Sequence, residues 1–236
     1  MKPLYLSLFL CFFLFNCSKN GGAGGSDSGS AETSAAQDST ATTPAPAPPT
    51  NPTTGTTTVG SSGGGSSLPN QAFTFDTNIL MINMKVSQEE KVRTAAELIQ
   101  KVIATDEFRK RVLNHTYKGK KTFVDNGGYT NAQIYQKILD GAETLQRAKN
   151  NTMDLEVELY YQASSTIGYT YVSTKRIYMN TKYFNTYKAY QVASNMMHEW
   201  LHKVGFGHAF SYSTSRDYSV PYAIGYLILE LAGKID

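Results

Sequence analysis

Residues 198–208 read His-Glu-Trp-Leu-His-Lys-Val-Gly-Phe-Gly-His, and they determine the architecture expected around them. The apolar spacing that leads into this stretch predicts a helix over 187–203. Because residues four apart lie on one face of a helix, His198 and His202 can direct their rings at one point. Glu199 lies one position round from His198, so its carboxylate falls beside that point rather than on it. These positions predict a metal site with a carboxylate next to it.

Gly205 and His208 complete the pattern. A glycine three residues after the second histidine can adopt a positive φ at little cost and end the helix there. The turn then brings His208 back as a third ligand, and three protein ligands leave one coordination position open, as in catalytic zinc sites. Cys11 and Cys17 are the only cysteines, and both lie near the N-terminus. A metal ion bound elsewhere in the chain must therefore be held by histidines and carboxylates.

The spacing His-Glu-x-x-His-x-x-Gly-x-x-His resembles the signature of the metzincin clan of zinc peptidases, and all five fixed positions match. The resemblance implies that zinc is held by His198, His202 and His208, and that Glu199 is the catalytic general base. It also implies hydrolysis of a peptide or protein substrate, by an endopeptidase rather than an exopeptidase. The alternative is a helix that exposes its histidines to solvent and pairs Glu199 with Lys203, four residues further on.

The sequence departs from the clan in one respect, because no methionine follows the third histidine. Met196 and Met197 are the last methionines, and residues 219–222, Ser-Val-Pro-Tyr, occupy the region where the clan has its methionine turn. Pro221 fixes φ, so a tight turn of similar shape is expected. In some metzincins, such as the astacins, a tyrosine just beyond this turn reaches the metal. The resemblance makes Tyr222 a candidate catalytic donor to the oxyanion, and the alternative is a tyrosine that only packs.

Two other classes of function fit the same residues. A surface adhesin or scaffold could retain the fold without activity, but a protein that only binds does not need Glu199 beside the metal. A zinc hydrolase that acts on a cell-wall amide would use the same groups, and the sequence does not separate it from a peptidase. Nucleic-acid binding is not expected, because the formal net charge is +3 and the charges are interspersed. The fourth histidine, His115, stands alone and is expected to be solvated or to end a helix.

The rest of the chain predicts an α+β domain over 71–236. Regularly spaced apolar residues predict further helices over 88–104, 106–113, 131–147 and 222–231. Alternating or continuous apolar residues predict strands over 73–86, 154–162, 168–173 and 175–180. We expect a zincin-like metallopeptidase domain with a mixed sheet, an active-site helix and a C-terminal helix. The substrate is expected to lie along an edge strand at Arg176–Asn180.

Three local patterns refine these boundaries. Ser87 and Glu90 have the spacing of a capping box, which starts the first helix at the residue after Ser87. The run 125–128, Asp-Asn-Gly-Gly, is a strong turn signal. Along 131–147, Leu145 falls on the same helix face as the isoleucines that precede it, so it is expected to be buried.

The N-terminus has the features of a secretory signal. A lysine at position 2 is followed by an apolar run over 4–15, and twelve helical residues would span about 18 Å, short of the roughly 30 Å of a bilayer core. Residues 1–16 are therefore predicted to be a signal peptide. The sequence Leu-Phe-Asn-Cys at 14–17 resembles the lipobox of bacterial lipoproteins, which implies that Cys17 is lipidated. Asn16 departs from the small residue usual there, and the alternative is an ordinary signal peptide with an incidental cysteine.

Residues 17–70 are composed almost entirely of small and polar side chains, mainly Gly, Ser, Ala, Thr and Pro. Such a segment buries too little apolar surface to offset the entropy of ordering, so a disordered tether is predicted. A flexible chain of this length reaches on the order of 40 Å. We expect a monomeric domain anchored by lipid to a membrane of the bacterial cell envelope, facing the periplasm or the exterior.

Overall fold

The computed structural model describes residues 74–236, which form an α+β domain as expected. The predicted signal peptide over 1–16, the lipidation site Cys17 and the tether over 17–70 lie outside this range. In chain order the elements are β1 (Asp76–Ile82), α1 (Val86–Ile103), α2 (Asp106–Leu113), α3 (Asn131–Asp140), β2 (Thr152–Tyr160), β3 (Gly168–Thr170), β4 (Arg176–Asn180), α4 (Thr181–Phe184), α5 (Ala189–Lys203), the short 3-10 helix η1 (Arg216–Tyr218) and α6 (Val220–Ala232).

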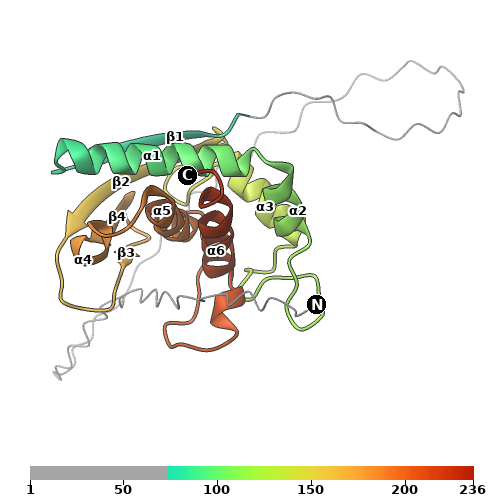
Figure 1. The fold of residues 1–236 in the computed structure, drawn as a ribbon. Coiled ribbons are helices and arrows are strands. Elements are labelled where there is room, and N and C mark those ends of the chain that lie inside the picture. Colours follow the sequence, from blue (N-terminus) through green and yellow to red (C-terminus); the bar gives the residue numbers. More distant parts are fainter. Residues whose placement is uncertain (1–73) are drawn as a thin grey trace, which may run out of the picture. The chain divides into compact units, whose positions relative to one another are not determined.

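The strands form a mixed sheet in the order β1-β2-β4-β3, which confirms the expected mixture of directions. Strands β1, β2 and β4 run parallel, and β3 pairs antiparallel with β4. Parallel neighbours need a long connection, and the chain passes through α1, α2 and α3 between β1 and β2 (Figure 1). The expectation that Arg176–Asn180 is an edge strand is wrong, because β4 has a neighbour on each side. The edge at this end of the sheet is β3.

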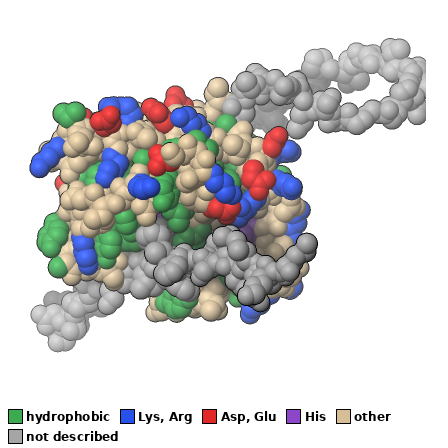
Figure 2. Space-filling view, viewed as in Figure 1, with side chains coloured by type: hydrophobic (Ala, Val, Ile, Leu, Met, Phe, Trp, Pro, Cys, Tyr) green, Lys and Arg blue, Asp and Glu red, His purple; other side chains and the backbone are tan. Residues whose placement is uncertain are grey.

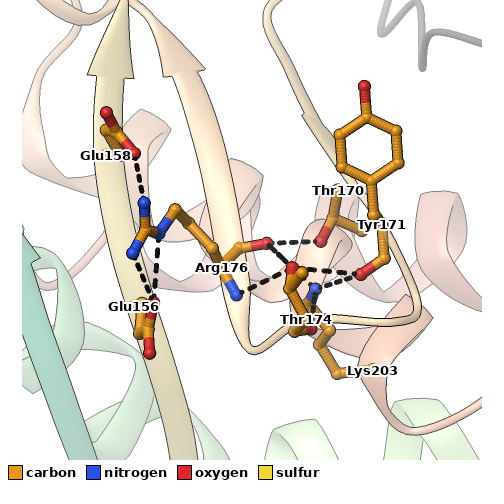
Figure 3. A network of polar contacts seen from close by, with 7 residues as sticks. All are labelled: Glu156, Glu158, Thr170, Tyr171, Thr174, Arg176 and Lys203. Carbon is orange, nitrogen blue, oxygen red and sulfur yellow. Dashed lines mark hydrogen bonds and ion pairs between the residues drawn. The ribbon is translucent and has the colours of Figure 1, made fainter.

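Helices cover one face of the sheet (Figure 1). Side chains alternate along β2, so Leu155 and Val157 are buried in the helix-covered core. On the other face, Arg176 of β4 forms ion pairs with Glu156 and Glu158 of β2, at N–O distances of 3.0 and 2.8 Å (Figure 3). The helices therefore pack on the face of the sheet that carries Leu155 and Val157, and the opposite face carries the ion pairs.

Helix α5 packs against both α1 and α6, and its Trp200 is fully buried in the core. The indole Nε1 of Trp200 donates a hydrogen bond of 2.7 Å to the carboxylate of Glu143. The same carboxylate oxygen accepts the backbone N–H of Asp154 in β2, at 3.0 Å. This buried carboxylate therefore links the centre of α5 to the sheet.

Two predicted helix boundaries are wrong, for identifiable reasons. Helix α1 begins at Val86, and the Lys85 N–H donates to the side chain of Gln88 at 2.9 Å, so Ser87 lies inside the helix and does not cap it. Helix α3 ends at Asp140, because Gly141 adopts φ of 62° and turns the chain. Leu145 follows that turn and is 51% exposed, not buried.

Other boundaries agree more closely with the sequence. Helix α2 spans the predicted residues, since Thr105 caps its first turn by accepting the N–H of Phe108. The turn predicted over 125–128 is present, with positive φ at both of its glycines. Strand β2 begins and ends two residues before its predicted limits, and the single-turn helix α4 was not expected.

The surface of the described domain carries charges of both signs. On the face shown in Figure 2, basic and acidic side chains are interspersed over the described part of the chain. Among the described residues, no helix combines the length and the apolar character needed to cross a bilayer. The predicted anchor at Cys17 lies outside those residues.

Candidate metal centre

Helix α5 carries His198, Glu199 and His202 in the interior of the domain. Their exposed fractions are 0%, 1% and 9%, respectively. The alternative, in which these histidines are exposed to solvent, is therefore wrong. The proposed pairing of Glu199 with Lys203 is also absent from the ion pairs of the described residues, because the Lys203 ammonium is directed at backbone carbonyls.

The end of α5 turns the chain back on itself at Gly205, whose φ is 103°. The N–H of Phe206 donates to the carbonyl of Leu201 at 3.0 Å, and the N–H of Gly205 donates to the carbonyl of His202 at 3.2 Å. These two bonds make a Schellman motif, the usual way for a glycine to end a helix. The turn predicted at Gly205 is thus present, and it brings His208 back toward the helix.

The three histidines of the motif converge on one point. One ligand nitrogen from each of His198, His202 and His208 lies within 4.8 Å of the other two. The Nε2 atoms of His198 and His208 are 3.2 Å apart, and the centroids of the three rings are 4.9–5.1 Å apart. This is the arrangement expected of side chains that share one ion, so the three histidines can hold a metal.

Backbone carbonyls orient the rings of this cluster. Nδ1 of His202 lies 2.8 Å from the carbonyl oxygen of Phe206, and Nδ1 of His208 lies 3.0 Å from that of Ala209. Because a carbonyl only accepts, each Nδ1 carries the proton and each Nε2 is left with a lone pair for a metal. The ring of His198 is hydrogen-bonded with the backbone of Pro221, in the segment just before Tyr222.

The surroundings of the cluster favour neutral imidazoles. Burial lowers the pKa of His198 well below its ordinary value, and repulsion from the other two rings acts in the same direction. Burial, helped by His208, lowers the pKa of His202 to about 4, and burial also lowers the pKa of His208. Neutral imidazole is the form that binds a metal, so the protein holds these ligands ready for binding near neutral pH.

Glu199 directly follows His198 in α5, and one of its carboxylate oxygens is uncommitted. Its Oε2 is buried and has no hydrogen-bond partner among the described residues. Burial raises the pKa of Glu199 to about 8, while Lys203 and the side chain of Asn195 act in the opposite direction. A metal ion in the cluster would add positive charge and favour the ionised carboxylate. A carboxylate in this position can exchange a proton with a group bound at the centre.

Lys203 fixes the end of α5 to the turn between β3 and β4. Its ammonium donates to the carbonyls of Tyr171, Thr174 and Arg176 at 2.7, 2.5 and 2.9 Å (Figure 3). Burial lowers the pKa of Lys203 to about 8, and the negative charge of Glu199 opposes this effect. The three bonds hold the β3–β4 turn against the helix that carries two of the histidines.

Tyr222, the candidate catalytic tyrosine, lies against the cluster. Its ring is fully buried, with its centroid 4.6 Å from that of His198 and 4.7 Å from that of His208. Tyr222 lies in the first turn of α6, immediately after Pro221. The ring contacts alone are compatible with both packing and catalysis.

Three residues of the site were not predicted from the sequence. Asn195 is fully buried one helical turn before Glu199, and this spacing of four was a signal that could have identified it. Lys203 was considered only as a partner for Glu199. Arg216 is 4% exposed, and its guanidinium carbon lies 4.7 Å from the centroid of Tyr222. No local pattern marks Arg216, because its position depends on how the loop after His208 folds.

His115 does not join the metal cluster. It follows α2, and its ring stacks on that of Phe123 at a centroid distance of 4.0 Å. Its side chain is half-buried and burial lowers its pKa, so it is not fully solvated, but it lies just after the end of α2, as the second of the two expectations had it. His115 lines a separate cavity of about 220 Å³ together with Tyr218 and Tyr226.

Comparisons with known proteins add no relative. No protein-family model, no curated protein and no solved structure matches the chain. The residues of the site, their geometry and their chemistry are therefore what indicates a function.

Proposed function

We propose that this protein is a zinc-dependent peptidase with a zincin-like fold, as its resemblance to the metzincins implies. One observation supports this most strongly: ligand nitrogens of three histidines lie within 4.8 Å of one another, and the buried Glu199 directly follows His198 on the same helix. Structural zinc sites normally take four protein ligands, whereas catalytic sites take three. The described residues supply three, together with a proton acceptor, which is the donor set of a catalytic site.

Each residue has a distinct role in the proposed reaction. Zinc, when bound, supplies a Lewis acid for the substrate carbonyl and lowers the pKa of water at the open position. Glu199 accepts a proton from the attacking water and delivers it to the leaving amine, through the oxygen that has no other partner. The phenol of Tyr222 donates a hydrogen bond to the carbonyl oxygen as negative charge develops on it.

The edge strand β3 is the proposed platform for an extended substrate, in place of β4. β3 approaches α5 closely, because Gly168 has no side chain: a Cβ there would lie 2.7 Å from Oδ1 of Asn195. Lys203 holds the turn after β3 against the same helix. A peptide paired with this edge would therefore pass close to Glu199, one helical turn after Asn195.

A scaffold or adhesin is the less favoured function, because binding alone does not require a buried carboxylate at the metal. A zinc hydrolase of a cell-wall amide would use the same histidines and Glu199 in the same roles. These two amide substrates differ in what surrounds the bond that is cleaved, so the choice between them requires an assay of both.

The test uses the full chain and begins with metal analysis after reconstitution with zinc. We expect about one zinc per chain, because the three histidines form a complete ligand set. We also expect cleavage of a mixed peptide library, loss of cleavage with a chelator and recovery when zinc is returned. Failure to bind zinc would contradict the proposal, and cleavage of cell-wall fragments without cleavage of peptides would favour the amide alternative.

We also propose that the protein is attached to a membrane of the bacterial envelope through lipid on Cys17. Cys17→Ser is expected to abolish incorporation of a fatty-acid analogue and to release the protein from membranes. The serine removes the thiol that would carry the lipid but leaves the domain unchanged. Equal labelling of the wild type and Cys17→Ser would contradict this part of the proposal.

A further inference from the structure

Arg216 is the only arginine among the buried side chains of the described residues, at 4% exposed. It forms no ion pair with any described aspartate or glutamate. Its Nε is buried and has no hydrogen-bond partner there, and the guanidinium's hydrogen bond from Nη1 to the carbonyl of Phe210 is long at 3.4 Å. Burying a charge without an opposite charge is costly, so this guanidinium requires an explanation.

The guanidinium lies in a stack that ends at the metal centre. Its carbon is 5.2 Å from the ring centroid of Tyr212 and 4.7 Å from that of Tyr222, and cation–π attraction offsets part of the cost of burial. Tyr212 is 54% exposed, whereas Tyr222 is buried against His198 and His208. Only one aromatic ring therefore separates Arg216 from two of the metal ligands.

The neighbouring Asp217 offsets the charge of Arg216 only in part, since the two do not form an ion pair. Burial raises the pKa of Asp217, and Arg216 opposes that rise. A divalent metal ion at the three histidines would add more positive charge than the single carboxylate of Glu199 offsets, so the field near Arg216 favours an anionic ligand.

We propose that Arg216 binds a carboxylate of the substrate next to the metal centre. The planar guanidinium matches a carboxylate through two parallel hydrogen bonds, and Nε is one of the donors available for them. The carboxylate comes either from the free C-terminus of a peptide or from an acidic side chain beside the bond that is cleaved. This inference rests on the proposed function, and it narrows the substrate class to peptides that carry such a group.

The loop between His208 and Arg216 offers a route for such a ligand. Its residues Phe210 and Tyr212 are 59% and 54% exposed, and Tyr212 lies over the guanidinium. A small displacement of Tyr212 would uncover Arg216 to a bound peptide. A purely structural role for Arg216 would be to hold this loop through the carbonyl of Phe210, and the experiment must distinguish the two roles.

The test measures peptide binding by calorimetry to zinc-loaded full-length protein that carries Glu199→Gln, so that bound peptides are not cleaved. Three matched peptides are compared: one with a free C-terminal acid, one with a C-terminal amide, and one amide with glutamate in place of glutamine. We expect one or both carboxylate forms to bind about 10- to 100-fold more tightly than the neutral form, the range for a hydrogen bond to a charged group. The form that gains affinity identifies the source of the carboxylate.

Adding Arg216→Met should abolish this preference while zinc content is retained, and Arg216→Lys should restore part of it. The matched control is Arg111→Met, because Arg111 is paired with Glu230 on the surface and should leave the preference unchanged. A structural role would weaken binding of all three peptides equally. Two results would overturn the inference. In the first, the Glu199→Gln protein with Arg216 intact binds the three peptides equally or binds none of them. In the second, the preference for a carboxylate survives Arg216→Met.

Failure of the proposed function would be seen separately, as absence of zinc or of cleavage by the wild type. A wild-type chain that binds zinc and cleaves neutral peptides as readily as acidic ones would retain the function and lose the role of Arg216. Repeating the titrations on zinc-free protein separates the two further, because the guanidinium does not depend on the metal for its charge.

Discussion

The region around His115 and the region around the three clustered histidines use the same side chain with different results. Burial lowers the pKa of His115, as it lowers the pKa of His198. His115 also lines a cavity of about 220 Å³ and has a buried Nε2 without a partner among the described residues. Yet only His198, His202 and His208 form a group of three ligand atoms close enough to share an ion, within the described residues.

The difference lies in how the rings are held. The ring of His115 is held by stacking on Phe123. This stacking does not direct its nitrogens toward other metal-binding side chains. In the cluster, carbonyls hold the Nδ1 atoms of His202 and His208, and each Nε2 is directed toward the other rings. A lowered pKa and a nearby cavity are therefore common to both regions. Convergence of lone pairs distinguishes a metal centre, and the experiments below test that distinction.

The largest effect is expected from Glu199→Gln, which preserves shape but removes the proton acceptor. General-base assistance typically contributes about 10²–10⁴-fold, so turnover should fall by that order. Zinc content should not change, because Glu199 is not in the group of three ligands. Steady-state kinetics and metal analysis on the same samples check both points. The control is Glu97→Gln on the exposed side of α1, and a Glu199→Gln variant as active as wild type would rule out the proposed reaction.

The next effect compares the two regions directly. Zinc sites with four ligands contribute about 10–16 kcal/mol, so the share of one ligand corresponds to roughly 10²–10³-fold in affinity. His208→Ala is expected to weaken zinc binding by that amount, whereas His115→Ala should leave it unchanged. Competition with a chromophoric chelator measures both constants. Equal losses in the two variants would show that the convergence of the three histidines has no role in binding.

Tyr222→Phe removes one hydroxyl from the residue that packs on two ligands. If the phenol stabilises the oxyanion, kcat should fall by up to about 10²–10³-fold with little change in KM, since the interaction is made mainly in the transition state. If the ring only packs, phenylalanine will substitute with almost no kinetic effect. Tyr226→Phe, one turn later on α6, is the matched control, because it removes the hydroxyl of a neighbouring ring that contacts Tyr222 at a centroid distance of 5.9 Å. A neutral Tyr222→Phe would remove the catalytic assignment and leave the metal centre intact.

The features that the sequence predicted well are those that local chemistry determines. The i, i+4 spacing of His198 and His202 needs only a helix to bring their rings together, and Gly205 provides its own reason for the helix to end. Helix α2 matched its predicted limits because Thr105 caps it by a bond within its first turn. In these cases every group that matters lies within a few residues.

The features that escaped prediction depend on partners far along the chain. Strand β4 pairs with both β2 and β3, and the residues Arg176–Asn180 alone could not predict these two neighbours. Lys203 looked like a surface partner for Glu199, but it binds carbonyls of a turn about thirty residues earlier. The guanidinium of Arg216 packs against the rings of Tyr212, on a loop, and Tyr222, on α6. The zinc ligands could thus be predicted, whereas the groups that surround them could not.

The smallest effect is expected from substitutions at two nearby glycines, Gly205 and Gly207, which test how the chain positions the third histidine, His208. Gly205 has φ of 103°, and a Cβ there would meet only Cγ2 of Thr144 at 3.5 Å, an ordinary contact. The cost of Gly205→Ala is therefore backbone strain rather than a clash, about 1–2 kcal/mol. For a domain of this size that corresponds to a fall of about 2–8 °C in the unfolding temperature.

Gly207 provides the control, because a Cβ there would meet nothing within 4 Å and its φ is not positive. Gly207→Ala should leave the unfolding temperature unchanged, although both glycines lie between the second and third histidines. The melts are done on zinc-free protein, since bound metal would add its own stabilisation to the folded state. Zinc titration then shows whether the strain at Gly205 also displaces His208, in which case affinity falls only in Gly205→Ala. Identical behaviour of the two variants would mean that the Schellman turn at Gly205 does not position the third ligand.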